Sequence, residues 1–274
     1  SAAYNFVVSY FSFFLTAVAG VSPAVAGTII SAALIWDMAA DPVAGYLLDR
    51  SKNKYGTRRP WILRSLIPMG AALVLMFLKV DMPQTPKNIY YLVLVLVFWT
   101  AYTSFNIPYY TFGVVLTNED SERVKLAAYR EVLGYVGIFC ASSVPAFIVG
   151  KLLESGVGDK GAWAAAGVAV ALITMVTIFV MWGCTGGKER IRGRSAARRA
   201  VKKGFFRHII ALLKMKPYIL VIVCALFTNI GLTLFNSSLV YYVNYNMGLG
   251  ETQAALMLTA MNIVSIVFIP FIVK

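Results

Sequence analysis

Charged side chains are scarce in this sequence. Asp, Glu, Lys and Arg make up only 14% of its 274 residues, whereas a soluble domain usually contains about a quarter. Residues 1–36 contain no charged residue, and neither do residues 217–250. Hydrophobic residues make up 59%, and apolar runs of roughly 20 residues, the length of a helix that crosses a bilayer, recur along the chain. The scarcity of charge excludes an ordinary soluble protein and predicts one that crosses a membrane several times.

Cysteine and histidine are also rare. Cys140, Cys184 and Cys224 lie in or at the end of apolar runs, so we expect buried single thiols rather than disulfides or a metal site. The one histidine, His208, lies in a basic stretch, where we expect a solvated side chain rather than a catalytic one. The sequence shows no nucleotide-binding glycine loop, metal-ligand cluster or serine–histidine pair. We therefore expect no enzyme and no cofactor, and an ion gradient rather than ATP as the energy source.

The alternating apolar and polar pattern of a membrane β-barrel is absent as well. Continuous apolar runs such as residues 161–184 instead predict helices, because a helix satisfies its own backbone hydrogen bonds in lipid. The predicted fold class is therefore all-α, a polytopic helix bundle with eight spans. The expected spans are residues 1–20, 23–49, 61–80, 88–116, 124–152, 161–184, 217–246 and 252–273.

Basic residues are concentrated in the loops. Lys and Arg outnumber Asp and Glu by 25 to 12, which in a soluble protein would suggest nucleic acid as a partner. Here five basic residues lie in residues 50–59, and eleven lie in residues 188–216 beside one acid, Glu189. Basic loops are typical of the cytoplasmic side of a membrane and contact anionic lipid. We therefore expect a cytoplasmic N-terminus in the plasma membrane, the bilayer as a partner, and no nucleic acid.

The basic stretch at residues 185–216 divides the chain into unequal parts. We expect residues 1–184 to form a bundle of six helices and residues 217–274 to form the first two helices of a second bundle. The connecting stretch contains a predicted amphipathic helix that lies on the inner membrane surface. Its apolar face consists of Phe205, Ile209, Leu212 and Leu213.

A weak internal repeat supports two related halves. Gly20 begins the turn between the first two spans and Gly248 the turn between the last two, and in each case an alanine follows six residues later. Six-helix halves related by a parallel repeat occur in secondary transporters. We therefore expect four further helices in the complete protein. The chain starts inside an apolar run without a signal-peptide pattern, so we also expect the first helix to begin upstream.

Two carboxylates in the second span are the strongest functional signal. Asp37 and Asp41 lie four residues apart, on one face of a helix and about one turn from each other. Carboxylates at bilayer depth are costly, so we expect them to face a cavity, a partner charge or an ion. Such a pair can bind Na⁺ or take up and release a proton. The alternative is that Asp41 and Pro42 mark a kink, which would not explain Asp37.

The fourth and fifth spans supply candidate partners. Thr103 and Asn106 offer neutral oxygen ligands, and Asn106 can also bond to sugar hydroxyls. Tyr110 offers a flat ring for stacking on a sugar, although an aromatic packing surface is the alternative. Arg130 can bind hydroxyls or a carboxylate with its fork of donors. It could instead pair with an aspartate of the second span or face the headgroups.

The connection between the second and third spans is a candidate latch. An acidic helix end is followed by a cationic turn, which could form a cytoplasmic contact that breaks when two bundles rock. An anchor that only sets membrane topology is the alternative, and both can hold. The latch residues are Asp49, Arg50, Gly56, Arg58 and Arg59.

Four stretches resemble the glycoside–pentoside–hexuronide:cation symporter family of the major facilitator superfamily. They are residues 35–63, 102–112, 128–137 and the pair 216–223 and 241–248. The resemblance implies twelve helices in two bundles and alternating access to a central site. It also implies symport of a sugar or glycoside with H⁺ or Na⁺ by a protein that functions as a monomer.

The resemblance also implies roles for individual residues. Asp37 and Asp41 match the cation-binding aspartates of the family, and Thr103 matches a cation ligand. Substrate-binding positions are matched by Asn106, Tyr110 and Arg130. Two departures stand out: Ala40 replaces an oxygen ligand of the Na⁺-using pattern, and Asn106 replaces an aspartate. The alternatives are a lipid or lysolipid transporter on the same fold and a truncated protein that does not transport.

Overall fold

A computed structural model describes residues 2–51, 58–116, 119–186, 214–242, 246–247 and 264. The chain divides into two compact units, residues Ser1–Arg192 and Gly193–Lys274. Every regular element in the described residues is helical, so the predicted all-α class is confirmed there. In the second unit, the described element is α9 (Lys216–Tyr241). The elements of the first unit are α1 (Ala2–Phe13), the π-helix η1 (Phe14–Val18), α2 (Pro23–Arg50), α3 (Arg59–Met76), α4 (Gln84–Leu116), α5 (Asp120–Glu154) and α6 (Asp159–Cys184).

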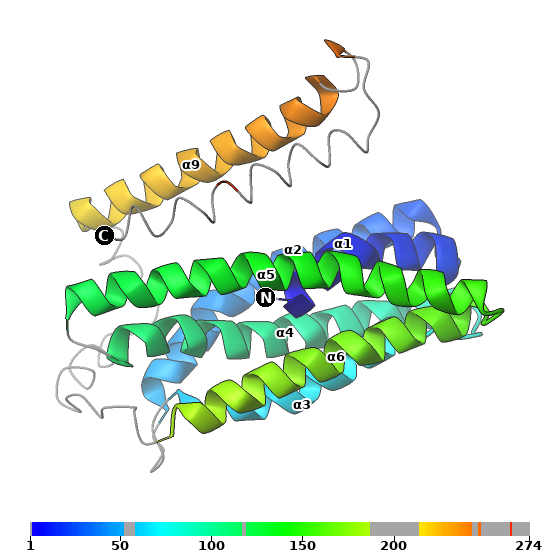
Figure 1. The fold of residues 1–274 in the computed structure, drawn as a ribbon, viewed down its shortest axis with the longest axis horizontal. Helices are drawn as coiled ribbons and strands as arrows, with labels where there is room; N and C mark the ends of the chain where they lie inside the picture. The colour runs from blue at the N-terminus through cyan, green and yellow to red at the C-terminus, as the bar shows by residue number, and fades with distance from the viewer. Residues whose placement is uncertain are drawn as a thin grey trace. The chain divides into compact units, whose positions relative to one another are not determined.

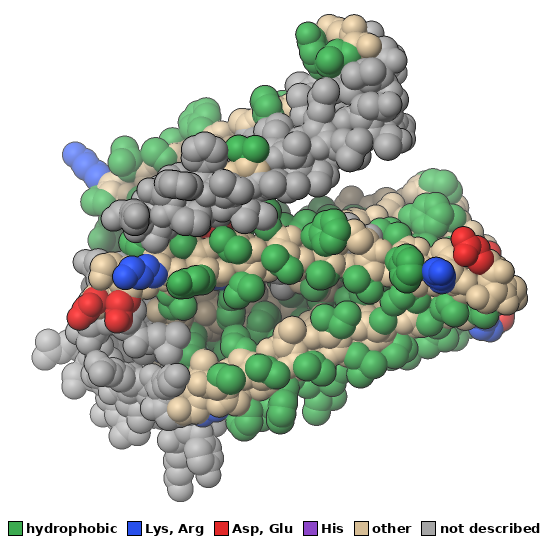
Figure 2. Space-filling model, in the orientation of Figure 1, with side chains coloured by type: hydrophobic (Ala, Val, Ile, Leu, Met, Phe, Trp, Pro, Cys, Tyr) green, Lys and Arg blue, Asp and Glu red, His purple; other side chains and the backbone are tan. Residues whose placement is uncertain are grey.

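These helices agree with seven of the eight expected spans to within a few residues. The eighth, residues 252–273, lies outside the described residues except for residue 264, and so do His208 and the predicted amphipathic helix. Within the described residues, four helices are long and apolar enough to cross a membrane: α2, most of α4, most of α5 and α6. Figure 2 shows hydrophobic side chains along the visible helices and charged side chains near their ends. An apolar outer surface of this kind is suited to contact with lipid.

Proline punctuates the helices at their starts and inside them. Pro23 opens α2 and Pro60 opens α3, where a missing amide hydrogen costs no helical bond. Pro42 and Pro108 lie inside α2 and α4, where each removes one bond to a carbonyl a turn earlier. Helices that pack on one another in a membrane tolerate such breaks, because neighbouring groups can satisfy the freed carbonyl.

Within the first unit, α4 packs against α2 and α3, α3 packs against α6, and α5 packs against α6 and α1 (Figure 1). An aromatic cluster forms part of the core where α1, α3 and α6 meet. The rings of Phe6 and Phe77 stack with centroids 4.2 Å apart, and Phe77 also stacks on Trp163 at 6.2 Å. Ring pairs in these arrangements add to the gain from burial, so the cluster ties three helices together.

The bundle of the first unit has two chemically different ends. We call the end where α2 stops and α3 begins the basic end, since it carries Arg50, Arg58 and Arg59. The opposite end carries the turn at residues 77–83 and the start of α6. Helix 1 also finishes at the opposite end, in the π turn η1 followed by Gly20 with φ of +68°. The Nζ of Lys87 donates to the carbonyl of Ala19 at 3.1 Å, which ties this helix end to α4.

The expectation of three buried thiols is wrong for two of them. Cys140 is half-buried, whereas Cys184 and Cys224 are exposed, and all three are free. An apolar residue of a membrane helix can face lipid instead of protein, so an apolar setting in the sequence does not imply burial in the bundle.

Candidate functional site

The predicted cation ligands of α2 and α4 meet inside the first unit. The hydroxyl of Thr103 donates a hydrogen bond to Oδ1 of Asp37 at 2.9 Å. Thr103 is 1% exposed and Asp37 is half-buried, so the bond lies at the packed contact between the two helices. The partner is neutral, and the described residues place no ion pair on Asp37, so the negative charge of an ionised Asp37 is not compensated by them. The pair therefore has the chemistry of an acceptor site for a proton or a metal cation.

Asp41 lies one turn closer to the basic end and is exposed. The structure thus brings Thr103 against Asp37 and leaves Asp41 open at the next turn of the same helix. Pro42 lacks an amide hydrogen, so the carbonyl of Met38 also loses its helical donor. This stretch of α2 therefore offers two carboxylates and one freed carbonyl as oxygen ligands.

A second hydrogen bond joins the same two helices and was not predicted from the sequence. Trp36 donates from Nε1 to Oγ1 of Thr100 at 2.9 Å, and Thr100 in turn donates to the carbonyl of Leu96 at 2.7 Å. Trp36 precedes Asp37, and Thr100 lies one turn before Thr103. Two neighbouring bonds therefore fix the rotation of α2 against α4 at the carboxylate. The i, i+3 spacing of the two threonines was the available signal.

The predicted substrate ligands lie further along α4 toward the basic end. Thr103, Asn106 and Tyr110 follow one another at steps of three and four residues, so they share a helix face about 10 Å long. Asn106 is half-buried and Tyr110 is 49% exposed. The face places neutral polar groups next to an aromatic ring, in line with the carboxylate contact.

Arg130 of α5 closes this face at the basic end. Its guanidinium carbon lies 4.6 Å from the centre of the Tyr110 ring, a cation–π distance. The side chain is 36% exposed, and its Nη2 lies 3.2 Å from Oε1 of Glu131. The Nε of Arg130 is buried, and no described residue accepts a hydrogen bond from it. Arg130 thus pairs with Tyr110 and Glu131 rather than with an aspartate of α2, which was one of the alternatives.

A cavity of about 330 Å³ adjoins Arg130 between α4, α5 and α6. Its walls combine aromatic rings, two arginines and a threonine hydroxyl with a few aliphatic side chains. A mixed lining of this kind suits a ligand with a ring and several polar groups. The lining residues are Tyr109, Tyr110, Phe112, Gly113, Arg123, Leu126, Ala127, Arg130, Met181 and Thr185.

Two arginines of the predicted latch bond to neighbouring helices. Arg58 donates from Nε to Oγ1 of Thr111 on α4 at 3.0 Å. Arg59 donates from Nη2 to the carbonyl of Trp182 on α6 at 2.7 Å and lies over the indole at 4.8 Å. Cationic side chains near the last carbonyls of a helix are favoured by its dipole. The two arginines therefore hold the ends of α4 and α6 at the start of α3.

The other two latch residues that the structure describes, Arg50 and Asp49, do not join these contacts. Arg50 donates to the hydroxyl of Tyr46 at 2.8 Å within α2. Asp49 is exposed, and the described residues give it no hydrogen bond or ion pair. Gly56 lies outside the described residues. A contact between the acidic helix end and the cationic turn thus stays a prediction.

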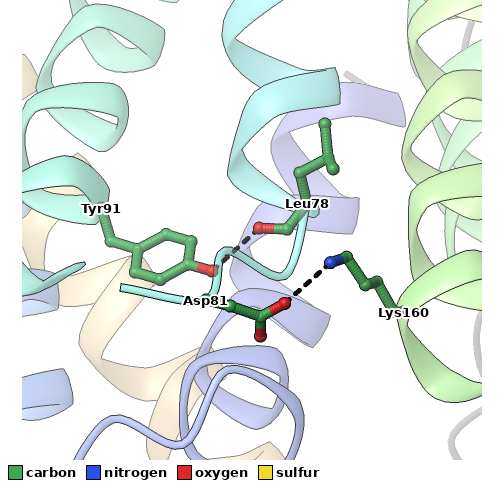
Figure 3. A network of polar contacts seen from close by, with 4 residues as sticks. All are labelled: Leu78, Asp81, Tyr91 and Lys160. Carbon is green, nitrogen blue, oxygen red and sulfur yellow. Dashed lines mark hydrogen bonds and ion pairs between the residues drawn. The ribbon is translucent and has the colours of Figure 1, made fainter. Parts of the chain in front are cut away.

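The opposite end holds a polar network that the sequence did not single out (Figure 3). Lys160 at the start of α6 donates from Nζ to Oδ2 of Asp81 at 2.9 Å, and the hydroxyl of Tyr91 donates to the carbonyl of Leu78 at 2.9 Å. The hydrogen bond and the positive charge of Lys160 hold the pKa of Asp81 below its usual value. These contacts fasten the α3–α4 turn to α4 and α6.

No cluster of three or more His, Cys, Asp or Glu side chains occurs among the residues that the structure describes. The candidate cation site is therefore of a different kind, with hydroxyl and carboxylate oxygens from two helices. Oxygen ligands of this type suit Na⁺ and other hard cations, and a carboxylate alone suffices for a proton.

The long apolar helices and the carboxylate at the contact of two of them are typical of a polytopic membrane protein with a polar site between packed helices. The family described as MFS/sugar transport protein matches the chain over residues 1–274. The chain belongs to this family of transporters, and the resemblance to the glycoside–pentoside–hexuronide symporters is confirmed.

Curated relatives are symporters and sugar transporters. The chain is 34% identical over 131 residues to the inner membrane symporter YicJ of Escherichia coli, which is 48% of this chain and 28% of that protein. It is 27% identical over 244 residues to the isoprimeverose transporter of Lactiplantibacillus pentosus, 89% of this chain and 50% of that protein. It is also 25% identical to the sodium-dependent lysophosphatidylcholine symporter 1-A of Danio rerio, over 92% of this chain and 52% of that protein. The chain thus spans about half or less of these relatives.

Proposed function

We propose that this chain forms the cation-binding part of a symporter that moves sugars or glycosides together with H⁺ or Na⁺. The observation that carries the proposal is the hydrogen bond between Thr103 and Asp37 across the contact of two membrane helices. Among the described residues it gives the carboxylate of Asp37 a neutral partner and no ion pair. Asp41, one turn away, is the second carboxylate of the site.

Coupling follows from the cost of that charge. An ionised carboxylate away from water is unfavourable, so binding of a cation to Asp37 and Asp41 stabilises whichever arrangement of the helices closes around them. If the solute binds the same arrangement, each ligand raises the affinity for the other. Asn106, Tyr110 and Arg130 lie along α4 and α5 toward the basic end and supply the solute contacts. Release then follows when the arrangement opens on the other side.

The membrane orientation is part of the proposal. The basic end faces the cytoplasm, because residues 50–59 and 188–216 hold most of the loop arginines and lysines. The N-terminus then lies inside. The proposal further places the protein in the plasma membrane, where it works as a monomer. Single cysteines placed at Glu154 and at Arg123 should be labelled from opposite sides of the membrane by an impermeant maleimide.

Uptake by the full-length protein in proteoliposomes tests the function. Labelled glycosides are supplied under an imposed Na⁺ gradient or pH gradient, with wild type, Asp37→Asn and Asp41→Asn compared at equal protein content. We expect both substitutions to abolish accumulation against a gradient, because the uncharged amide neither takes up a proton nor attracts a cation. Glu154→Gln, which removes an exposed carboxylate at the end of α5, serves as the matched control and should accumulate normally. Accumulation that survives in both aspartate variants contradicts the proposal.

A lysolipid is the second candidate substrate. The similarity to the Danio rerio lysophosphatidylcholine symporter over 92% of this chain favours it. In that case Arg130 binds the phosphate of the lipid rather than a sugar hydroxyl. Competition separates the two: excess lysophosphatidylcholine should leave glycoside uptake unchanged if the substrate is a sugar. Cation-driven uptake of labelled lysophosphatidylcholine, without any uptake of glycosides, would replace the first candidate by the second.

A further inference from the structure

A groove of the first unit is lined by none of the proposed cation and solute ligands. It has a volume of about 480 Å³ and runs between α3 and α4, with one wall from α2. Aliphatic side chains and two indoles make up most of its surface. The lining residues are Trp36, Trp61, Arg64, Ser65, Pro68, Val93, Leu96, Val97, Thr100, Ala101 and Ser104.

Arg64 is the one charged side chain of this lining. It lies on α3 slightly more than one turn beyond Arg59, at the part of the groove nearest the basic end. Arg64 is exposed, and in the described part of the chain it makes no hydrogen bond and no ion pair. An arginine next to an apolar membrane surface is costly unless its head reaches water or an anion. The position therefore suits a negatively charged partner.

The shape of the groove adds an apolar requirement. Its α4 wall extends from Val93 to Ser104, a length of about 16 Å along the helix axis. Beyond Arg64 the walls are Pro68, Val93 and Val97, which offer only apolar contacts. A ligand that satisfies both parts carries an anion at one end and a long hydrocarbon chain at the other.

We propose that the groove binds an anionic phospholipid of the surrounding bilayer. Its phosphate bonds to Arg64, and one acyl chain lies along Pro68, Val93 and Val97. Trp61 lies at the start of α3, near the basic end, and indoles favour the interface with the headgroups. The basic end is the side that attracts anionic lipid, because Arg50, Arg58 and Arg59 lie there. Free phosphate would satisfy Arg64 but leave the hydrocarbon part of the groove empty.

The lipid is a structural ligand and not the transported solute. Trp36 forms one wall of the groove and donates to Thr100, next to the contact of Asp37 with Thr103. An acyl chain packed on that wall supports the seam between α2 and α4 from outside. The binding itself does not depend on which solute or ion the protein carries.

Native mass spectrometry of the full-length protein tests the site. The protein is reconstituted in nanodiscs of equal parts phosphatidylglycerol and phosphatidylcholine, released into the gas phase, and the retained lipid is counted. Wild type should retain one phosphatidylglycerol more than Arg64→Gln, with apparent affinity reduced about tenfold by loss of a charged hydrogen-bonding partner. Lys125→Gln removes an exposed positive charge of α5 near the basic end, and this variant should retain the lipid as wild type does. Inorganic phosphate at the same concentration should not displace it.

A second variant separates the hydrocarbon contact from the charge. Val97→Phe fills the groove and keeps Arg64, so it should also lose the retained lipid while the fold, checked by thermal melting, persists. Equal retention in wild type, Arg64→Gln and Val97→Phe overturns the proposal. So does equal loss in Lys125→Gln, which would show attraction by general charge.

Discussion

Two carboxylates of the first unit each accept a hydrogen bond of 2.9 Å, yet their partners differ. Asp37 accepts from the neutral hydroxyl of Thr103 between two membrane helices, and Asp81 accepts from the ammonium group of Lys160 at the opposite end. A neutral donor orients a carboxylate but leaves its charge uncompensated, whereas an ammonium group orients the carboxylate and also compensates its charge. In the proposed function Asp37 is therefore the carboxylate that binds and releases a cation, while Asp81 already has Lys160 as its counter-ion. The comparison separates a binding carboxylate from a fastening one.

Removing each charge should give the largest difference between the two carboxylates. Asp37→Asn should reduce cation-driven accumulation to the level of liposomes without protein, because the charge that attracts the cation is gone. Asp81→Asn should keep accumulation close to wild type, since that carboxylate lies in an exposed turn. Uptake by both variants in proteoliposomes measures the difference. An equal loss in the two would mean that the carboxylates do not have separate roles.

Changing the neutral partner should have the next largest effect. Thr103→Val removes the hydroxyl and keeps the shape. The cation concentration that gives half-maximal uptake should therefore rise about tenfold, the usual scale for a hydrogen bond to a charged group. Thr103→Ser keeps the hydroxyl and should restore most of the affinity. The measurement is uptake against Na⁺ concentration or pH at fixed solute. A valine variant with unchanged half-saturation would remove Thr103 from the site.

The bond beside the carboxylate should have a smaller effect. Trp36→Phe removes the indole donor to Thr100, so half-saturation by the cation should rise about threefold, in line with one neutral hydrogen bond. Thr100→Val should have a similar effect, and the double variant should be no worse than either single one. Fully additive effects would show that the two side chains act separately. The KM for the solute at saturating cation should stay unchanged in all three.

The ion pair at the opposite end should give the smallest effect, and one that depends on pH. Lys160 lowers the pKa of Asp81 in the folded protein, so the ion pair stabilises fully above the ordinary aspartate pKa of about 3.9 and is lost as the pH falls through the lowered value. The melting temperature of wild type should therefore exceed that of Asp81→Asn by a constant small amount at neutral and weakly acidic pH. The gap should close only in strong acid. A gap that widens on acidification would contradict this assignment.

The sequence predicted the parts of the site that depend on single helices. Asp37 and Thr103 stand out because polar residues are conspicuous inside apolar runs, and helical spacing gives the face that each occupies. The ends of α2 and α6 also agree closely with the expected spans, since charge and proline mark them.

Contacts between helices far apart in the sequence could not be predicted from the sequence. Nothing in the spacing shows that Trp36 bonds to Thr100 or that Arg130 lies on Tyr110 and not on an aspartate, because these pairs follow from how the helices pack. The exposure of Cys184 and Cys224 was missed for a similar reason: apolar character shows a preference for lipid or protein, without distinguishing the two. The π turn at the end of helix 1 also has no marker in its apolar sequence.

The bond from Arg59 to the carbonyl of Trp182 has a mechanical consequence. It pins the last turn of α6 to the first residue of α3, three residues before the chain continues beyond Thr185. A force applied to the chain beyond Thr185 therefore acts on both α6 and α3 instead of unwinding α6 alone. The strain would travel along α3, whose far end is braced in turn by the ring of Phe77 against Trp163.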